Sequence, residues 1–251
     1  MKQPYKRGRY EWHAAGMRRA VLFDLDGTLV DSDRAYFFAE REALAHFGYE
    51  GFTYADHQRF AGVGMRDMWE ILLSERDVRA SVDQLLEVGD RLYLQRLRQS
   101  LKVYSGVAGL AARLRGAGFG LAVASGSSRA VIAAVLSSAG LSSCFSVQVS
   151  AEEVPRGKPD PAVFQEAARR LRVSWEDCTV VEDTAAGVQA ALRAGMKCVA
   201  VTSKAARECP SAVNAGRVLL AEHASFDDAV VFGWITAGSG RTVLRSEGQR
   251  F

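Results

Sequence analysis

Long apolar runs and a cysteine framework are both missing from this sequence of 251 residues. The longest strictly apolar run is Ala130–Leu136, whereas a membrane-spanning helix needs about 20 such residues. The few cysteines show neither metal-ligand spacing nor the density of a disulfide scaffold. They are Cys144, Cys178, Cys198 and Cys209. We therefore expect no membrane association, and reduced, mostly buried thiols in a cytoplasmic protein.

Excess positive charge is confined to the two ends of the chain. The net charge is +3, but residues 1–19 hold six of the 32 Lys and Arg residues and 236–251 hold three, with one acid at each end. Residues 20–235 therefore carry 23 basic and 27 acidic side chains, a net charge of −4. Because no basic stripe is interleaved with aromatic residues, we expect no binding to nucleic acid.

The basic N-terminus lacks the apolar segment of a secretory signal. We expect residues 1–17 to form a flexible tail. An over-long start, with Met17 as the true initiator, or an arginine-rich transit peptide are the alternatives. Residues 236–251 are expected to form a second tail at the C-terminus.

Short apolar segments alternate with helical patterns through most of the chain. Segments rich in valine, with polar C-terminal ends, predict buried strands at 20–24, 121–125, 146–150, 179–182 and 198–202, with 217–221 as a candidate sixth. Helical patterns lie at about 107–117, 128–139, 160–171 and 184–194, and helix-ending glycines stand at Gly118, Gly140 and Gly195. This alternation predicts an α/β fold: a mostly parallel sheet, covered on both faces, that binds ligands beyond the C-terminal ends of its strands.

The alternation stops between Asp31 and Ser105, where we find no convincing strand. Apolar residues instead fall at helical spacing over 36–47, 68–73 and 86–101. We expect a helical domain at 32–103, inserted after the first strand of a core formed by 18–31 and 104–235. Its aromatic residues are interpreted as its own hydrophobic core rather than as a cofactor site.

Two carboxylates follow the first strand directly, in the segment DLDGTLVDS. Asp24 and Asp26 stand at the end of a buried strand, where charge is costly unless something pairs with it, and a divalent cation is a natural partner. Gly27 permits a sharp turn there. On its own, such a pair of acids is often part of a solvated loop. Whether it marks a functional site therefore depends on the residues at the other strand ends.

Ser125 ends the second predicted strand and is followed by Gly126. Its hydroxyl and the next backbone N–H groups, at a helix N-terminus, are suited to holding a phosphate oxygen. A plain helix cap by Ser127 or Ser128 is the alternative interpretation of this serine-rich loop.

Lys158 and the pair Glu182–Asp183 complete the polar set. Lys158 stands between Gly157 and Pro159, which restrain its backbone so that its ammonium could be aimed at a phosphate; a surface lysine is the alternative. Glu182–Asp183 follows another predicted strand and offers further ligands for a hard cation, or simply two acids that favour a helix N-terminus.

These motifs, in this order, resemble those of the haloacid dehalogenase superfamily of phosphotransferases. They are DLDGTLVDS, VASGSS, RGKPDP and VVEDTAAGVQAALRAG, all between residues 20 and 202. The resemblance implies a Rossmann-like, doubly wound parallel sheet with an inserted helical cap. The beta-phosphoglucomutase-like sugar phosphatases are the most similar group.

The resemblance also implies an activity, the Mg²⁺-dependent hydrolysis of small phosphate monoesters such as sugar or polyol phosphates. Asp24 would be the nucleophile that forms an aspartyl-phosphate, and Asp26 the acid and base that protonates the leaving group and then activates water. The partner would be a small phosphorylated metabolite. The sequence gives no indication of the oligomeric state.

The resemblance assigns the remaining residues to the metal and the phosphate. Mg²⁺ would be bound by Asp24, Asp183 and the backbone carbonyl of Asp26, with Glu182 in or near its shell. The phosphate group of the substrate would lie against Ser125, Gly126 and Lys158. The serine hydroxyl and the lysine ammonium would stabilise the phosphate oxygens.

Three other functions compete with hydrolysis. Dehalogenases of the family lack the second aspartate, whereas Asp26 is present. Mutases carry a histidine and a lysine in the cap where this chain has Tyr36 and Ala61, which favours hydrolysis over isomerisation. A non-catalytic phosphate-binding protein, like a receiver domain, would have its acids in a different order and no insertion of this size.

The sequence does not name the substrate, whose selection we expect to lie in the cap. Candidate contributors are Arg59, Arg66 and Asp67, around a glycine-rich loop at 62–64. Arg129, just after the serine loop, is a further candidate for the cleft.

Overall fold

The computed structural model of this chain describes residues 19–237. The expected tail at 1–17 lies outside the described residues, and so does all but the start of 236–251. A single sheet of six parallel strands forms the centre, in the order β3-β2-β1-β4-β5-β6. The strands are β1 (Ala20–Phe23), β2 (Gly120–Ser125), β3 (Val147–Ser150), β4 (Cys178–Glu182), β5 (Lys197–Ala200) and β6 (Val218–Leu220).

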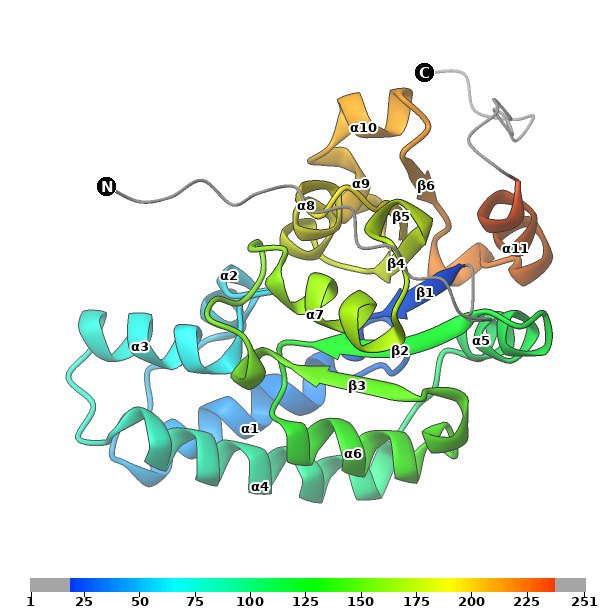
Figure 1. Cartoon of the computed structure of the whole chain (residues 1–251). Helices are drawn as coiled ribbons and strands as arrows, with labels where there is room; N and C mark the ends of the chain where they lie inside the picture. The colour runs from blue at the N-terminus through cyan, green and yellow to red at the C-terminus, as the bar shows by residue number, and fades with distance from the viewer. Residues whose placement is uncertain (1–18, 238–251) are drawn as a thin grey trace.

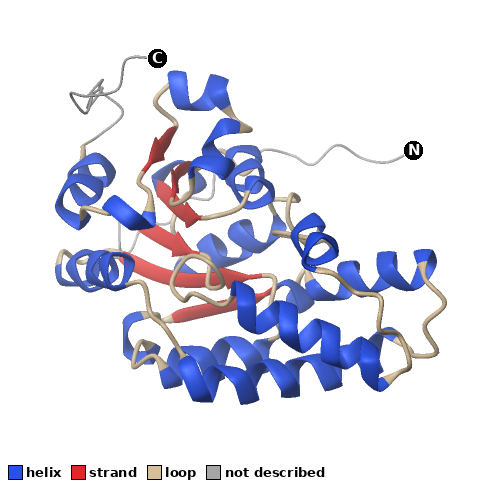
Figure 2. Cartoon of the chain, turned by 180° about the vertical axis from the view of Figure 1, so that it is seen from behind, coloured by secondary structure: helices blue, strands red, loops and turns tan. Residues whose placement is uncertain are grey.

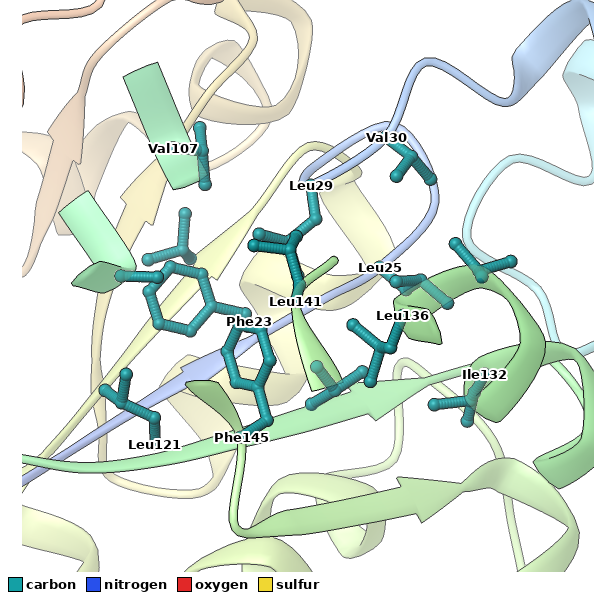
Figure 3. Close-up of a cluster of buried hydrophobic side chains, with 14 of the residues drawn as sticks. Phe23, Leu25, Leu29, Val30, Val107, Leu121, Ile132, Leu136, Leu141 and Phe145 are labelled. Carbon is teal, nitrogen blue, oxygen red and sulfur yellow. The ribbon is translucent and has the colours of Figure 1, made fainter. Parts of the chain in front are cut away.

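Helices cover both faces of this sheet (Figure 1). Because side chains alternate along a strand, Val21 and Phe23 join a core with one set of helices, and Leu22 joins a core on the opposite face. The first set is α5 (Ser105–Gly116), α6 (Arg129–Ser138) and α11 (Asp228–Thr236), and the second is α7 (Ala162–Leu171) and α8 (Ala185–Arg193). Figure 3 shows the first core, where the rings of Phe23 and Phe145 pack edge to face at 5.5 Å.

The predicted doubly wound α/β fold is therefore confirmed, including the sixth strand. The three predicted helix-ending glycines have φ of 82°, 69° and 82°, the left-handed conformation that ends helices. Three helices were not predicted from the sequence: α9 (Ser203–Arg207), α10 (Pro210–Asn214) and α11. The first two are too short to show a period, and α11 is apolar on nearly every side, so none displays an amphipathic pattern.

Four helices fill the chain between β1 and α5, and Figure 2 shows this part as helix and loop only. They are α1 (Asp33–His46), α2 (Tyr54–Arg59), α3 (Met65–Glu75) and α4 (Val82–Ser100). Fully buried Trp69, Leu72 and Leu85 belong to a hydrophobic cluster of their own. The segment leaves and re-enters the sheet region at one place, where Val30 and Val103 form an antiparallel bridge. Within residues 19–237 no helix has the length and apolar character needed to cross a bilayer.

Candidate active site

The predicted site residues converge at the C-terminal edge of the sheet. Asp24 follows β1, Ser125 ends β2 and Glu182 ends β4, and these three strands are neighbours with β1 in the middle. Lys158, from the loop before α7, joins them. A cavity of about 140 Å³ lies here, lined by these side chains and by residues of the helical insertion.

Three carboxylates gather at one end of this cavity. Asp24, Glu182 and Asp183 each offer an oxygen atom within 4.8 Å of the others. Burial raises the pKa of the Asp24 and Asp183 carboxyls well above the ordinary value, and the nearby Glu182 carboxylate raises both further. The Asp26 carboxylate is not part of this cluster, so its predicted contribution to a metal rests on its backbone carbonyl alone.

Lys158 is not a surface lysine, because it is only 6% exposed. Its ammonium donates hydrogen bonds to Asp24 and to Oε2 of Glu182, the latter over 2.7 Å, and lies 5.0 Å from the centre of the Phe164 ring. Burial opposes its charge, but the two carboxylates outweigh burial and raise its pKa. Three carboxylates and one ammonium leave a formal charge of −2, which a divalent cation bound by oxygen ligands would balance.

Glu182 organises the turn between β4 and α8. Its Oε1 accepts hydrogen bonds from the N–H groups of Asp183 and Thr184, at 3.1 and 3.0 Å, and from the Thr184 hydroxyl at 2.8 Å. A Cβ atom at Gly187 would lie 2.0 Å from the Glu182 carboxyl group, so only glycine fits there. With its other oxygen on Lys158, Glu182 has both oxygens occupied by donors from the protein.

Asp183 is held by the turn that follows β1. Its Oδ1 accepts the Thr28 hydroxyl at 2.9 Å. Gly27 has a φ of 77°, and a Cβ atom there would lie 2.3 Å from Asp183 Oδ2. His223 contacts the carbonyl of Gly27 at 2.8 Å and stacks on Tyr104. This histidine was not predicted, because it lies 196 residues from Gly27 along the chain and belongs to no motif.

Asp26 points to a different group of side chains, which come partly from the insertion. Tyr93 donates to Oδ1 at 2.6 Å, and Ser127 donates to Oδ2 at 2.6 Å. The Tyr36 hydroxyl lies 2.6 Å from Ser127 Oγ, and its ring stacks on Tyr93 at 3.7 Å. These two tyrosines of α1 and α4 are buried, but in the cluster they share with β1 and not in the insertion's own core as expected. Their hydroxyls reach Asp26 and its serine partner.

Ser125 is 1% exposed and borders the cavity. Its hydroxyl oxygen accepts the N–H of Ser127 at 3.1 Å and lies 3.5 Å from Asp26. The cap of α6 is Ser128, which accepts the N–H of Val131. The helix-cap interpretation therefore describes Ser128, and Ser125 is left beside the carboxylates.

The three arginines proposed as cleft residues point elsewhere, contrary to expectation. Arg59, Arg66 and Arg129 each form an ion pair with an exposed or partly exposed acid, and none lines the cavity. Their partners are Glu75, Asp83 and Glu153. A long cationic side chain on a helix surface finds such partners in solvent, without the cost of burial. Asp67 lies at the junction with the core, close to Gly157.

Other residues of the insertion line the cavity instead. His57 of α2 lies between two acids of α1, with Nδ1 2.6 Å from Glu40 and Nε2 3.2 Å from Asp33. Burial opposes its protonation, but these two carboxylates outweigh burial and raise the pKa of His57 to about 9. This group was not predicted, although Asp33 and Glu40 are seven residues apart in sequence and so share one face of α1.

Comparison with known proteins gives the family. The model of the haloacid dehalogenase-like hydrolases matches residues 18–195. The bifunctional riboflavin kinase/FMN phosphatase of Arabidopsis thaliana is 34% identical over 73% of this chain and 48% of its own length. The phosphorylated carbohydrates phosphatase of Thermotoga maritima is 29% identical over 80% of this chain and 93% of its own length.

Solved structures share the fold. CbbY from Rhodobacter sphaeroides, in complex with phosphate, has a TM-score of 0.69 and 25% identity, over 74% of this chain and 87% of its own. Beta-phosphoglucomutase from Clostridium difficile has a TM-score of 0.72 and 20% identity, over 87% of this chain and 97% of its own. The chain spans about half of the riboflavin kinase/FMN phosphatase and 18% of the chloroplast protein SUPPRESSOR OF QUENCHING 1 of Arabidopsis thaliana. With the family model covering most of the described residues, and with its motifs assembled at one sheet edge, the chain belongs to the haloacid dehalogenase-like hydrolases.

Proposed function

We propose that this chain is a Mg²⁺-dependent phosphatase that hydrolyses small phosphate monoesters, sugar or polyol phosphates among them, through an aspartyl-phosphate. One observation carries the proposal: Asp24, Asp183, Lys158 and Ser125 meet at a single cavity beyond the strand ends. The names of the relatives support it, since they include a phosphatase of phosphorylated carbohydrates and a fructose-1-phosphate phosphatase from Escherichia coli, the latter 30% identical over 72% of this chain.

The buried carboxylates fit a divalent metal ion. Asp24, Asp183 and the backbone carbonyl of Asp26 would hold Mg²⁺, with Glu182 in or near its shell. When bound, the metal would offset the repulsion between an anionic carboxylate and an anionic phosphate. Because Glu182 already accepts hydrogen bonds on both oxygens, its main task would be to fix the backbone of Asp183 and the ammonium of Lys158.

Asp24 would attack phosphorus with a carboxylate oxygen, forming a P–O bond as the bond to the ester oxygen breaks. Asp26 would give its proton to the departing alkoxide. It would then take a proton from the water that attacks the aspartyl-phosphate, which regenerates Asp24 and releases inorganic phosphate. Lys158 and Ser125 would stabilise the charge on the transferring oxygens.

We propose that residues 32–103 act as a cap on the core formed by 18–31 and 104–235. The loop at 62–64 already lies against the core: a Cβ atom at Gly62 would be 2.6 Å from the Thr184 hydroxyl, and Gly64 faces Gly126 at about van der Waals distance. A cap in this position would exclude bulk water while the aspartyl-phosphate forms.

A mutase is the second candidate, and the described cavity favours it less. Tyr36 and Ala61 line the cavity at the two positions where the mutases carry histidine and lysine. Among the lining residues of the described chain the sole lysine is Lys158, which belongs to the phosphate end. Incubation of beta-glucose 1-phosphate with a trace of the bisphosphate would yield inorganic phosphate rather than glucose 6-phosphate.

The test of the phosphatase is the Asp24→Asn variant, which keeps the shape of the side chain but removes the attacking anion. We expect Mg²⁺-dependent hydrolysis of p-nitrophenyl phosphate to fall by about 10³-fold or more with an unchanged circular dichroism spectrum. Asp31→Asn is the matched control, because Asp31 belongs to the same loop and pairs with Lys102 outside the cavity. Turnover by Asp24→Asn at the wild-type rate would refute the proposal.

A further inference from the structure

The cavity has two chemically different ends. The phosphate end is formed by the core residues described above. The opposite end is formed by α1, α2 and the start of α3, and it is lined by Asp33, Glu40, His57, Phe60, Met65 and Met68. A phosphate ester bound with phosphorus at Asp24 would place its leaving group toward these side chains.

Among residues 19–237, the polar side chains of this far end offer hydrogen-bond acceptors, and their donors are already used. Both ring nitrogens of His57 lie within hydrogen-bonding distance of carboxylates, so its two N–H groups are already used by Glu40 and Asp33. Glu40 is 3% exposed, and its Oε1 has no hydrogen-bond partner within residues 19–237 although the side chain borders the cavity. This oxygen is not one of the fully enclosed atoms that lack a partner, so it stays open to the cavity and can accept a donor from a ligand.

The far end is also negatively charged. Asp33, Glu40 and a protonated His57 carry a formal charge of −1, and the single other basic residue on the described cavity wall, Lys158, is bound to Asp24 and Glu182. The nearby arginines Arg59 and Arg66 are paired with acids away from the cavity. Among the described lining residues, a second anionic group on the substrate would therefore meet carboxylates and no unpaired cation, which is costly in a partly buried site. Arg34, next to Asp33, lies over the Tyr54 ring and does not line the cavity.

We infer that Asp33, Glu40 and His57 form the leaving-group subsite of this enzyme and restrict it to phosphate esters whose far end is uncharged and hydroxylated. This inference rests on the proposed phosphatase function. Hydroxyl groups of a polyol or sugar would donate to the two carboxylates, and the methionine and phenylalanine side chains would contact the C–H surface. Esters that carry a carboxylate or a second phosphate at that end would be rejected.

Two pairs of substrates isolate the charge. Phosphoglycolate and 2-hydroxyethyl phosphate differ by a carboxylate in place of a hydroxymethyl group, and fructose 1,6-bisphosphate differs from fructose 1-phosphate by one phosphate. We expect kcat/KM to be at least about tenfold higher for the uncharged member of each pair, the size typical of leaving one polar group unmatched. Equal kcat/KM values within both pairs would overturn the inference.

Variants assign the selectivity to these residues. In Glu40→Gln we expect the phosphoglycolate to 2-hydroxyethyl phosphate ratio of kcat/KM to rise by about tenfold, because one repelling charge is gone. Asp33→Asn, whose side chain is 49% exposed and so tolerates change, should shift the ratio in the same direction if Glu40→Gln does not fold. Glu70→Gln is the control, since Glu70 is an exposed acid of α3 that does not line the cavity. An unchanged ratio in both cavity variants would refute the assignment.

Binding separates this inference from the proposed function. Calorimetry on Asp24→Asn with Mg²⁺ measures the affinity for each ester without turnover, and we expect tighter binding of 2-hydroxyethyl phosphate than of phosphoglycolate. If no ester is hydrolysed by the wild-type protein, p-nitrophenyl phosphate included, the phosphatase function fails while this preference still tests the subsite. If hydrolysis occurs and phosphoglycolate binds as tightly, the subsite fails and the phosphatase stands.

Discussion

The carboxylate of Asp26 depends on a hydroxyl from the helical insertion. Tyr93 donates to Oδ1, and its ring is fully buried against Tyr36. Tyr93→Phe keeps the ring and removes the donor, so Asp26 would be less well oriented toward an ester oxygen. We expect kcat for a sugar phosphate to fall about 10- to 100-fold, within the usual size of acid catalysis, with a much smaller fall for p-nitrophenyl phosphate, whose leaving group needs no proton.

The difference between the two leaving groups distinguishes orientation of Asp26 from general damage. Tyr49→Phe, a hydroxyl removal in the insertion away from the cavity, is the control and should leave both rates unchanged. Equal losses on both substrates in Tyr93→Phe would show that the tyrosine serves folding alone.

His57 makes stability depend on pH. Its pKa is about 9 in the folded protein against an ordinary value of 6.5, so the folded state binds its proton more tightly than the unfolded state. The stabilisation is fully present below pH 6.5 and is lost as pH rises through about 9. We expect it to be on the order of 2 kcal/mol for this mostly buried side chain. The gap in melting temperature between wild type and His57→Gln should shrink from pH 6.5 to 9.5, and a constant gap would contradict the ion-pair assignment.

Residues at the strand ends could be located from sequence, and the partners of those residues could not. Asp24, Ser125 and Glu182 each follow or end a recognisable apolar strand, and parallel strands bring such ends together whatever the rest of the chain does. Tyr93 lies on an amphipathic helix, where sequence marks the buried face but not the polar group that a buried hydroxyl will meet. His57 lies on a helix of six residues with no buried face, so the sequence gives no periodic signal for its position.

At the scale of elements, the turn from β4 into α8 couples backbone shape to charge. Gly187→Ala would place a methyl group on the Glu182 carboxyl, which four hydrogen bonds hold in place. Glu182 would have to move and release Lys158. We expect a loss of about 1–3 kcal/mol in the free energy of unfolding, the usual cost of overpacking, together with a fall in kcat of at least about tenfold.

A second glycine provides the comparison for this change. Gly109 lies within α5, and a Cβ atom there would meet nothing within 4 Å. Gly109→Ala should therefore be neutral or stabilising by up to about 1 kcal/mol in chemical denaturation. If both variants behave alike, the effect at Gly187 is one of helix propensity and not of contact with Glu182.

The accuracy with which helices and strands were predicted depended on their length and on the regularity of their apolar pattern. The six strands lie within two residues of their predicted ends, since each combines an apolar run with turn signals. The four helices of the insertion were expected as three helical stretches, because α2 is only six residues long and is marked mainly by the capping box of Thr53 and Asp56. Short helices stabilised by tertiary contacts carry little periodic signal.

At the scale of the whole molecule, the site is shared between two parts of the chain that the sequence separates. The core supplies the carboxylate cluster and Lys158, and α1, α2 and α4 supply other lining residues and the hydroxyls around Asp26. The order of the motifs in the sequence predicted the residues that the core supplies. How the insertion packs against the core depends on tertiary contacts such as that between Asp90 of α4 and Ser128, which caps α6, and no local pattern encodes such contacts.

Metal binding should stabilise the entire chain, because folding alone assembles the carboxylate cluster. Asp24, Glu182 and Asp183 repel one another when buried, and Lys158 offsets only part of that repulsion. A ligand that binds only the folded state at 100 times its Kd contributes about 2.7 kcal/mol, which for a protein of this size is roughly 5–10 °C in melting temperature. We expect Mg²⁺ added to EDTA-treated protein to raise the melting temperature by that amount in calorimetry.

The Asp183→Asn variant should change the melting temperature in opposite directions with and without Mg²⁺. The variant removes one repelling charge and one proposed metal ligand while keeping an acceptor for the Thr28 hydroxyl. It should therefore melt at a higher temperature than wild type in EDTA, because burial of a charged carboxylate no longer opposes folding. In Mg²⁺ the order should reverse, since wild type gains the metal and the variant gains little. A variant that responds to Mg²⁺ as strongly as wild type would place the metal elsewhere.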